Sequence, residues 1–266
     1  GIDAIALVLP PYLLAELAPA AAATGKRLLI EKPVAASLAA GRKILEAVES
    51  SGVYCMAGHT LRFNSVCQAM RGLVPSLGRI DSVVMSQRFP PQTQLDWLDD
   101  PARSGGGNLL HTGVHCFDLI RYITGLEPRT VTCQVRSVVT VNTEDNFTAT
   151  LSLDRDGEAE ALAMVTCSRT AACYNGLIEI SGEKGQLVGD HVTGMLYRLG
   201  PDGREEVTVA EPVYTVMAAL ERFAHDWRQG ASRPPISYRD GLAAVAVADA
   251  CYRAAASGRR EEVAAL

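Results

Sequence analysis

Hydrophobic residues in the first part of the chain come in short runs that alternate with longer helical patterns. Residues 3–9 (DAIALVL) form a continuous apolar run, which is typical of a strand covered on both faces. Two further short strands and two helices that end in glycine follow it: the strands at 27–33 and 53–58, the helices at 13–25 and 37–52. Strand–helix–strand–helix–strand with short connections predicts a parallel α/β sheet.

Beyond residue 58 the pattern changes to a long series of strands. A helix is predicted at 64–74 and a strand at 79–89, followed by a polar, proline-bearing loop at 90–107. Seven strand-like segments separated by turn residues then run from Arg129 to about Val209: 130–139, 147–153, 160–168, 176–182, 185–190, 194–199 and 205–210. Helices at 213–229 and 239–257 close the chain.

These patterns predict two parts, a parallel α/β piece over residues 1–58 and an α+β domain over residues 59–266. The second part is expected to contain one large, mostly antiparallel sheet. The 266 residues are 48% hydrophobic, which suffices for a large core. The net charge of −5 and the lack of a basic patch argue against nucleic acid as a partner. The apolar runs are too short to span a bilayer, so no membrane association is expected.

Seven scattered cysteines include no CxxC pair. This usage is typical of reduced thiols in a cytoplasmic protein and argues against a zinc site built from cysteines.

Two short motifs stand where strands of the first part end. The IEKP motif at 30–33 places Glu31 and Lys32 at the carboxyl end of an apolar strand, where open parallel sheets bind ligands. A lysine there can position a substrate hydroxyl, and the alternative is a solvated strand end. GHTLRF at 58–63 places His59 and Arg62 at the domain junction, where a cleft or an interdomain salt bridge would suit them.

The stretch 105–125 (GGGNLLHTGVHCFDLIRYITG) carries His111, His115 and Asp118 at helical spacing, so all three are expected on one face. The glycines at 105–107 let the backbone come close to another group. Two histidines four residues apart can hold zinc, although Thr112 stands where a zinc-protease HExxH motif has glutamate. An acid/base histidine or a purely structural helix fits the local spacing as well.

The order of these motifs resembles the Gfo/Idh/MocA family, named after glucose-fructose oxidoreductase and inositol dehydrogenase. The resemblance rests on the EKP strand end, the GHTLRF junction, the glycine–histidine helix, ISGEKGQL and YRDGLAAVAVADACYRAAASGRR, and it covers essentially the whole chain. It implies an NAD- or NADP-binding Rossmann domain followed by a domain with an open-faced sheet. It also implies hydride transfer between nicotinamide and a hydroxyl carbon of a sugar, inositol or related polyol.

The resemblance also assigns roles to residues. Lys32 contacts substrate and cofactor, and His115 acts on the proton of the reacting hydroxyl. His111 stands where the family often has aspartate, so it is a candidate co-catalyst or substrate donor. The remaining candidates are Pro10, Glu31, Lys32 and Pro33 for the cofactor and Arg62, Trp97, His111 and Asp118 for the substrate. No metal is expected.

No GxGxxG fingerprint is present in the chain. The resemblance therefore implies that the sequence begins within the Rossmann domain, at about its fourth strand. We expect the 266 residues alone to expose an apolar strand edge, to aggregate and to bind NAD(P) poorly.

Two rival functions stay open. One is a metal-dependent hydrolase or lyase that uses His111, His115 and Asp118. The other is a non-catalytic sugar-sensing member of the family. In either case, we expect a homo-oligomer formed through the open sheet face.

Overall fold

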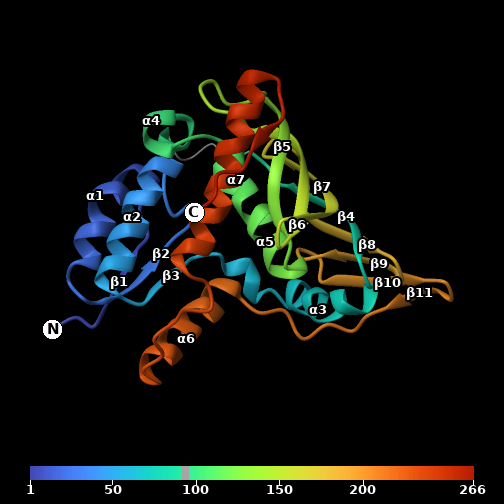
Figure 1. Cartoon of the computed structure of the whole chain (residues 1–266), viewed down its shortest axis with the longest axis horizontal. Coiled ribbons are helices and arrows are strands. Elements are labelled where there is room, and N and C mark those ends of the chain that lie inside the picture. Colours follow the sequence, from blue (N-terminus) through green and yellow to red (C-terminus); the bar gives the residue numbers. More distant parts are fainter. Residues whose placement is uncertain (92–95) are drawn as a thin grey trace.

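The computed structural model describes residues 1–91 and 96–266, so residues 92–95 of the predicted loop lie outside the described residues. A three-stranded parallel sheet opens the chain (Figure 1). Its elements are β1 (Ala4–Leu7), α1 (Pro11–Ala22), β2 (Arg27–Ile30), α2 (Leu38–Ser51) and β3 (Cys55–Ala57). The strands pair in the order β1-β2-β3, which confirms the predicted α/β piece. Among the described strands none pairs with the outer edge of β1.

A nine-stranded sheet dominates the rest of the molecule, in the order β11-β10-β9-β8-β4-β7-β6-β5-β12. Its strands are β4 (Ile80–Arg88), β5 (Glu127–Arg136), β6 (Asn146–Arg155), β7 (Glu158–Ser168), β8 (Asn175–Gly182), β9 (Gly185–Asp190), β10 (Met195–Gly200), β11 (Gly203–Glu206) and β12 (Glu261–Glu262). Within this nine-stranded sheet the described pairs are antiparallel except for β4 with β7, so the prediction of a mostly antiparallel sheet is confirmed.

Two details of this sheet differ from the sequence prediction. The strand expected at 205–210 ends at Glu206. The Val207 amide still donates to the Leu196 carbonyl at 2.9 Å, and beyond it the chain leaves the sheet. Pro212, which lacks an amide proton, lies a few residues further on. The short strand β12 was not predicted, since two residues are too few to show an alternating pattern.

Helices cover only one face of the large sheet. Three of them pack against it, α3 (Ser65–Leu73), α5 (Val114–Thr124) and α7 (Tyr238–Ser257), while α6 (Thr215–Arg228) projects from the body in Figure 1. The other face is lined by threonine and apolar side chains, and Leu162 on it is 67% exposed. Among the described helices none is long and apolar enough to cross a membrane.

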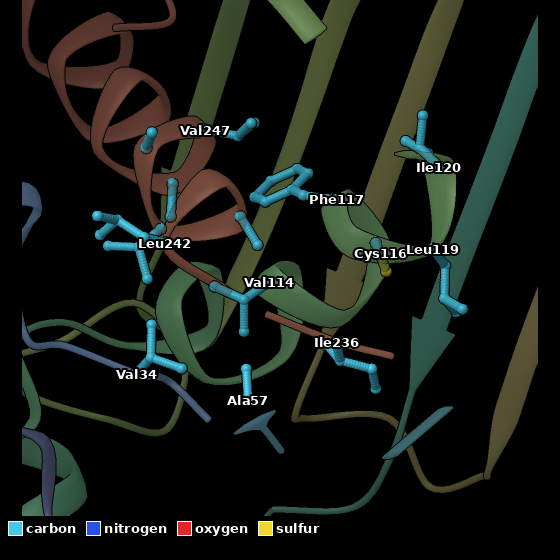
Figure 2. Close-up of a cluster of buried hydrophobic side chains, with 14 of the residues drawn as sticks. Val34, Ala57, Val114, Cys116, Phe117, Leu119, Ile120, Ile236, Leu242 and Val247 are labelled. Carbon is cyan, nitrogen blue, oxygen red and sulfur yellow. The ribbon is translucent and has the colours of Figure 1, made fainter. Parts of the chain in front are cut away.

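The two sheets share a buried apolar cluster (Figure 2). Val34 and Ala57 reach it from the first sheet, Val114 and Phe117 from α5, and Leu242 from α7. Helix α7 starts with a capping box in which the Ser237 hydroxyl accepts the Asp240 amide and the Asp240 carboxylate accepts the Ser237 amide. Because the Tyr238 hydroxyl also donates to the Val34 carbonyl at 3.1 Å, α7 ties the two sheets together.

Candidate active site

A cavity of about 620 Å³ opens where the two sheets meet. Its first wall consists of Val8–Pro11, which follow β1, and Glu31–Pro33, which follow β2. Its second wall comes from one edge of the large sheet, with Gln87 near the end of β4, Arg169 after β7 and His191 after β9. The cavity thus lies beyond the carboxyl ends of parallel strands, which is the usual ligand position in open α/β sheets.

Most of the candidate site residues line this cavity. The structure brings together Pro10, Glu31, Lys32, Pro33, Trp97, His111 and His115. Trp97 lies edge-on to the His111 ring, with 5.7 Å between the ring centroids. Arg62 and Asp118 are absent from the described lining residues, so the structure places these two candidates elsewhere.

Lys32 lines the cavity. Its Nζ donates to the His111 carbonyl at 3.1 Å, and the peptide bond to Pro33 is cis. Burial lowers the pKa of Lys32, the Glu31 carboxylate partly offsets this, and the nearby charge of Arg169 lowers it further. An ammonium with one donor on a protein carbonyl keeps two donors for a ligand.

The segment that carries the histidines is not a uniform α-helix. The short helix α4 (Pro101–Ser104) ends at Gly105, Leu109–Gly113 form a π-helical turn, and only Val114–Thr124 (α5) are α-helical. His111 lies in the π-helical turn, so the expected α-helical register of His111 with His115 and Asp118 is wrong. π-Helical turns inside helices are frequent at functional sites.

The three glycines before this turn contact the protein's own chain. A Cβ on Gly105 would meet the Ala36 backbone, one on Gly106 the Tyr252 ring, and one on Gly107 the Glu144 carbonyl. The Glu144 carboxylate accepts the amides of Gly107 and Leu109, at 3.1 and 2.8 Å. The glycines were expected to let the backbone come close to another group; that group is the protein's own chain, at Ala36, Tyr252 and Glu144.

We expect Gly107→Ala to destabilise the protein, because the added Cβ would clash with the Glu144 carbonyl oxygen, a backbone atom that side-chain movement cannot displace. The matched control is Gly72→Ala on α3, where a Cβ meets no atom within 4 Å. Alanine in an open helical position stabilises by about 0.4–1 kcal/mol. Thermal unfolding of both variants should show opposite shifts, and equal shifts would contradict the packing role of Gly107.

Two of the three described histidines that line the cavity have ring nitrogens without described partners. His111 Nε2 and His115 Nδ1 are buried and make no hydrogen bond with the described residues. Burial, with the charge of Lys32 nearby, lowers the pKa of His111 to about 3 and that of His115 well below its usual value. Both rings are therefore neutral at neutral pH.

Behind His115 lies a buried ion pair. Arg62 Nε and Nη2 donate to the two Asp118 oxygens at 2.8 and 2.6 Å, and His59 Nδ1 is 3.7 Å from the same carboxylate. The His59 ring stands edge-on to His115, with 6.0 Å between the centroids. Arg62 and Asp118 were expected to contact substrate; they instead pair with each other, because each satisfies the other's buried charge.

The ion pair of Arg62 and Asp118 argues against the alternative function of a metal-dependent hydrolase or lyase. Its ligand set needs the Asp118 carboxylate beside His111 and His115, but both carboxylate oxygens accept from Arg62. Over residues 1–91 and 96–266 no three His, Cys, Asp or Glu side chains are grouped to hold a metal ion.

Sequence reasoning missed several polar residues on the second wall. Gln87 Nε2 lies 3.1 Å from His191 Nε2, and both side chains line the cavity together with Arg169 and Asn175. Burial lowers the pKa of His191. The available signal was weak: each of these residues stands at a strand end, in SQRF, CSRT, YNG and VGDHV. Only the topology of the sheet shows that these ends share one edge.

Two models of one protein family match the chain. Residues 1–59 match "Oxidoreductase family, NAD-binding Rossmann fold", and residues 69–188 match "GFO/IDH/MocA C-terminal domain". Together these ranges cover more than half of the sequence.

Full-length relatives show the same likeness. Inositol 2-dehydrogenase of Rhizobium meliloti (strain 1021) is 25% identical, over 99% of this chain and 81% of its own length. 1,5-Anhydro-D-fructose reductase of Ensifer adhaerens is 26% identical, over 98% of this chain and 80% of its own.

Solved structures agree with this match. Aldose-aldose oxidoreductase from Caulobacter crescentus, complexed with glycerol, superposes with a TM-score of 0.86 at 25% identity, covering 98% of this chain and 79% of its own. Levoglucosan dehydrogenase, in complex with NADH and levoglucosan, has the same fold, with a TM-score of 0.90 at 21% identity over 100% of this chain and 81% of its own. The chain therefore belongs to the Gfo/Idh/MocA oxidoreductases, a family with an NAD-binding Rossmann fold.

Proposed function

We propose that the protein is an NAD(P)-dependent dehydrogenase that acts on a hydroxyl carbon of a sugar, inositol or related polyol bound in this cavity. The observation that carries the proposal is the juxtaposition of Lys32 with His115, a buried neutral histidine whose Nδ1 has no described partner. The relatives named above, an inositol dehydrogenase and an anhydrofructose reductase, support the reaction class.

Lys32 and His115 act on different atoms of the reacting hydroxyl. The free donors of the Lys32 ammonium hold the hydroxyl oxygen, and the neutral His115 ring accepts its proton as the carbonyl forms. Because burial keeps His115 unprotonated, the base is ready at neutral pH without a preceding deprotonation. The edge contact with His59, itself beside the Asp118 carboxylate, keeps the His115 ring in place.

The residues that follow β1 and β2 fit the nicotinamide end of a cofactor. Pro10, Glu31, Lys32 and Pro33 lie beyond carboxyl strand ends in the same cavity as the histidines, and the unpartnered nitrogens of His111 and His115 offer polar atoms there. When bound, NAD or NADP supplies the hydride acceptor for the oxidation. We propose that these four residues hold it.

The test is a dehydrogenase assay on the protein expressed from its natural gene. A panel of sugars, inositols and linear polyols is offered with NAD or NADP, and absorbance of the reduced cofactor is followed. We expect reduction with at least one member of the panel. Cofactor binding without reduction by any polyol would instead favour a non-catalytic sugar sensor.

We further propose that the open face of the large sheet is a contact between copies of the chain. Exposed Leu162 and Met164 lie on it beside Thr132 and Thr150, a mixed surface that a second sheet could cover. Leu162→Glu is expected to lower the oligomeric state in sedimentation experiments, while Val192→Glu at the cavity rim is not. A monomeric parent protein would exclude this interface.

A cytoplasmic location fits the thiols. All seven cysteines are free and six are buried, among them Cys116 and Cys167 with their sulfurs 3.7 Å apart. Such a pair stays reduced in the cytoplasm.

A further inference from the structure

Arg169 is a buried cation that the proposed mechanism does not use. It directly follows β7, and its amide donates to the Asp145 carbonyl at 2.9 Å. The residue is 6% exposed, yet its side chain lines the cavity. No hydrogen bond or salt bridge joins its guanidinium to another of the described residues, and its carboxylate neighbours Glu144, Asp145 and Asp99 act on it only through their charge. A buried guanidinium without a partner is costly unless a ligand supplies one.

The three neighbouring carboxylates are committed to other donors. Glu144 accepts the amides of Gly107 and Leu109 and the hydroxyl of Tyr252. Asp145 accepts the amides of residues 138–140, and Asp99 those of residues 141–143. Their oxygens are therefore directed at the backbone, and the Arg169 donors are left for the cavity.

The charges that line the cavity are unbalanced. Lys32, Arg88 and Arg169 are cationic, and Glu31 is the one acidic side chain among the described lining residues. Burial raises the pKa of Glu31 and lowers the pKa of Lys32, so it disfavours both of these charges and leaves the two arginines in excess. A cavity with an excess of positive charge favours an anionic ligand over a neutral one.

We propose that the substrate is a polyhydroxy carboxylate, a sugar acid whose carboxylate pairs with Arg169 while its reacting hydroxyl lies between Lys32 and His115. The inference rests on the proposed function and narrows its substrate class. The planar guanidinium matches a carboxylate through two parallel hydrogen bonds. Gln87 and Asn175, on the same wall, offer donors and acceptors for the remaining hydroxyls.

Lys32 and Arg169 line the same cavity, and the charges of both act on His111. One ligand bound in this cavity can therefore meet both cations.

The test is direct binding by calorimetry, without cofactor, to the protein expressed from its natural gene. The ligands are D-glucose, D-glucuronate and D-glucose 6-phosphate, which differ only at carbon 6. We expect glucuronate to bind roughly 10- to 100-fold more tightly than glucose, as a charged hydrogen-bonded pair provides. Equal or tighter binding of glucose would overturn the proposal. Tighter binding of the phosphate than of the carboxylate would also overturn it.

Substitutions of Arg169 test whether this residue causes the preference for glucuronate. Arg169→Gln should abolish the preference for glucuronate over glucose, and Arg169→Lys should keep part of the preference. Arg204→Gln on β11, whose arginine stacks on Tyr197 away from the cavity, is the charge-matched control and should bind as the parent does. A preference that persists in both Arg169 variants would refute the role of Arg169.

Failure of this proposal can be told apart from failure of the proposed reaction. Tight glucuronate binding by a protein that reduces NAD(P) with no member of the polyol panel would support Arg169 as the anion anchor and count against the dehydrogenase. Turnover of neutral polyols without acid preference would do the opposite.

Discussion

Replacement of His115 by alanine should lower turnover roughly 10²-fold or more while cofactor binding survives, because it removes the group that accepts the hydroxyl proton. Among the described residues His115 is the histidine that lines the cavity at the start of α5 and contacts a second histidine, His59, edge-on. Steady-state kinetics with the best polyol substrate measure the loss, and titration of NAD(P) checks that the cofactor still binds.

A matched control separates this effect from a general one. His225→Ala on α6 changes a histidine outside the cavity and should leave turnover unchanged. Turnover of His115→Ala close to that of the parent would refute the assignment.

The pH profile gives a second readout for His115. Its pKa is lowered from 6.5 by burial, so the neutral base is present above 6.5 and is lost only when the pH falls well below that value. Oxidation by the parent should therefore show no inflection at pH 6.5. An inflection there that vanishes in His115→Ala would show that the ring titrates normally in the working enzyme.

Removal of the Asp118 carboxylate should have the largest effect on stability. Asp118→Ala leaves the Arg62 guanidinium, 9% exposed, with its nearest remaining carboxylate in Asp240, 3.5 Å away. Breaking a buried ion pair from one side destabilises by about 3–5 kcal/mol. Urea unfolding measures the change in free energy.

Asp81→Ala is the control for this variant. Asp81 pairs with Arg79 at 3.2 Å, but both side chains are at least half exposed, so solvent screening limits the loss to about 1 kcal/mol or less. Equal losses in the two variants would show that the pair of Arg62 and Asp118 is no more important than a surface pair. Asp118→Leu combined with Arg62→Met should recover much of the lost stability, since no buried charge then remains.

The order of secondary-structure elements was readable from the sequence because each follows from a local pattern. The alternating strands after Arg129 reflect which faces are buried. The apolar run 3–9 predicted β1, but the expectation that both faces of this strand are covered is wrong, because among Ala4–Leu7 only Leu7 is buried. The π-helical turn at Leu109–Gly113 was not readable, since the Glu144 carboxylate that accepts the Leu109 amide at its start is more than thirty residues away. Local propensity cannot encode a contact that only the tertiary fold makes.

The residues of the candidate site fall into two groups: those that a local motif predicts and those that only the tertiary fold reveals. Lys32, His111 and His115 stand in compact motifs, and the order of these motifs along the chain predicted that the three residues belong to one site. Arg62 and Asp118 carried the same chemical signal, but whether a charged pair contacts ligand or contacts itself depends on side-chain packing. Arg169 and His191 follow strands β7 and β9, and nothing local marks the edge of the sheet on which they lie.

The position of α7 has a consequence for synthesis of the chain on the ribosome. The apolar side chains Val34 and Ala57 are made early, yet the helix that covers them ends at Ser257. At a rate of about 5–20 residues per second, roughly 10–40 s pass before residue 257 follows residue 57. During that interval the apolar side chains of Val34 and Ala57 stay exposed to water. Packing of the N-terminal part is therefore completed only after α7 has been made.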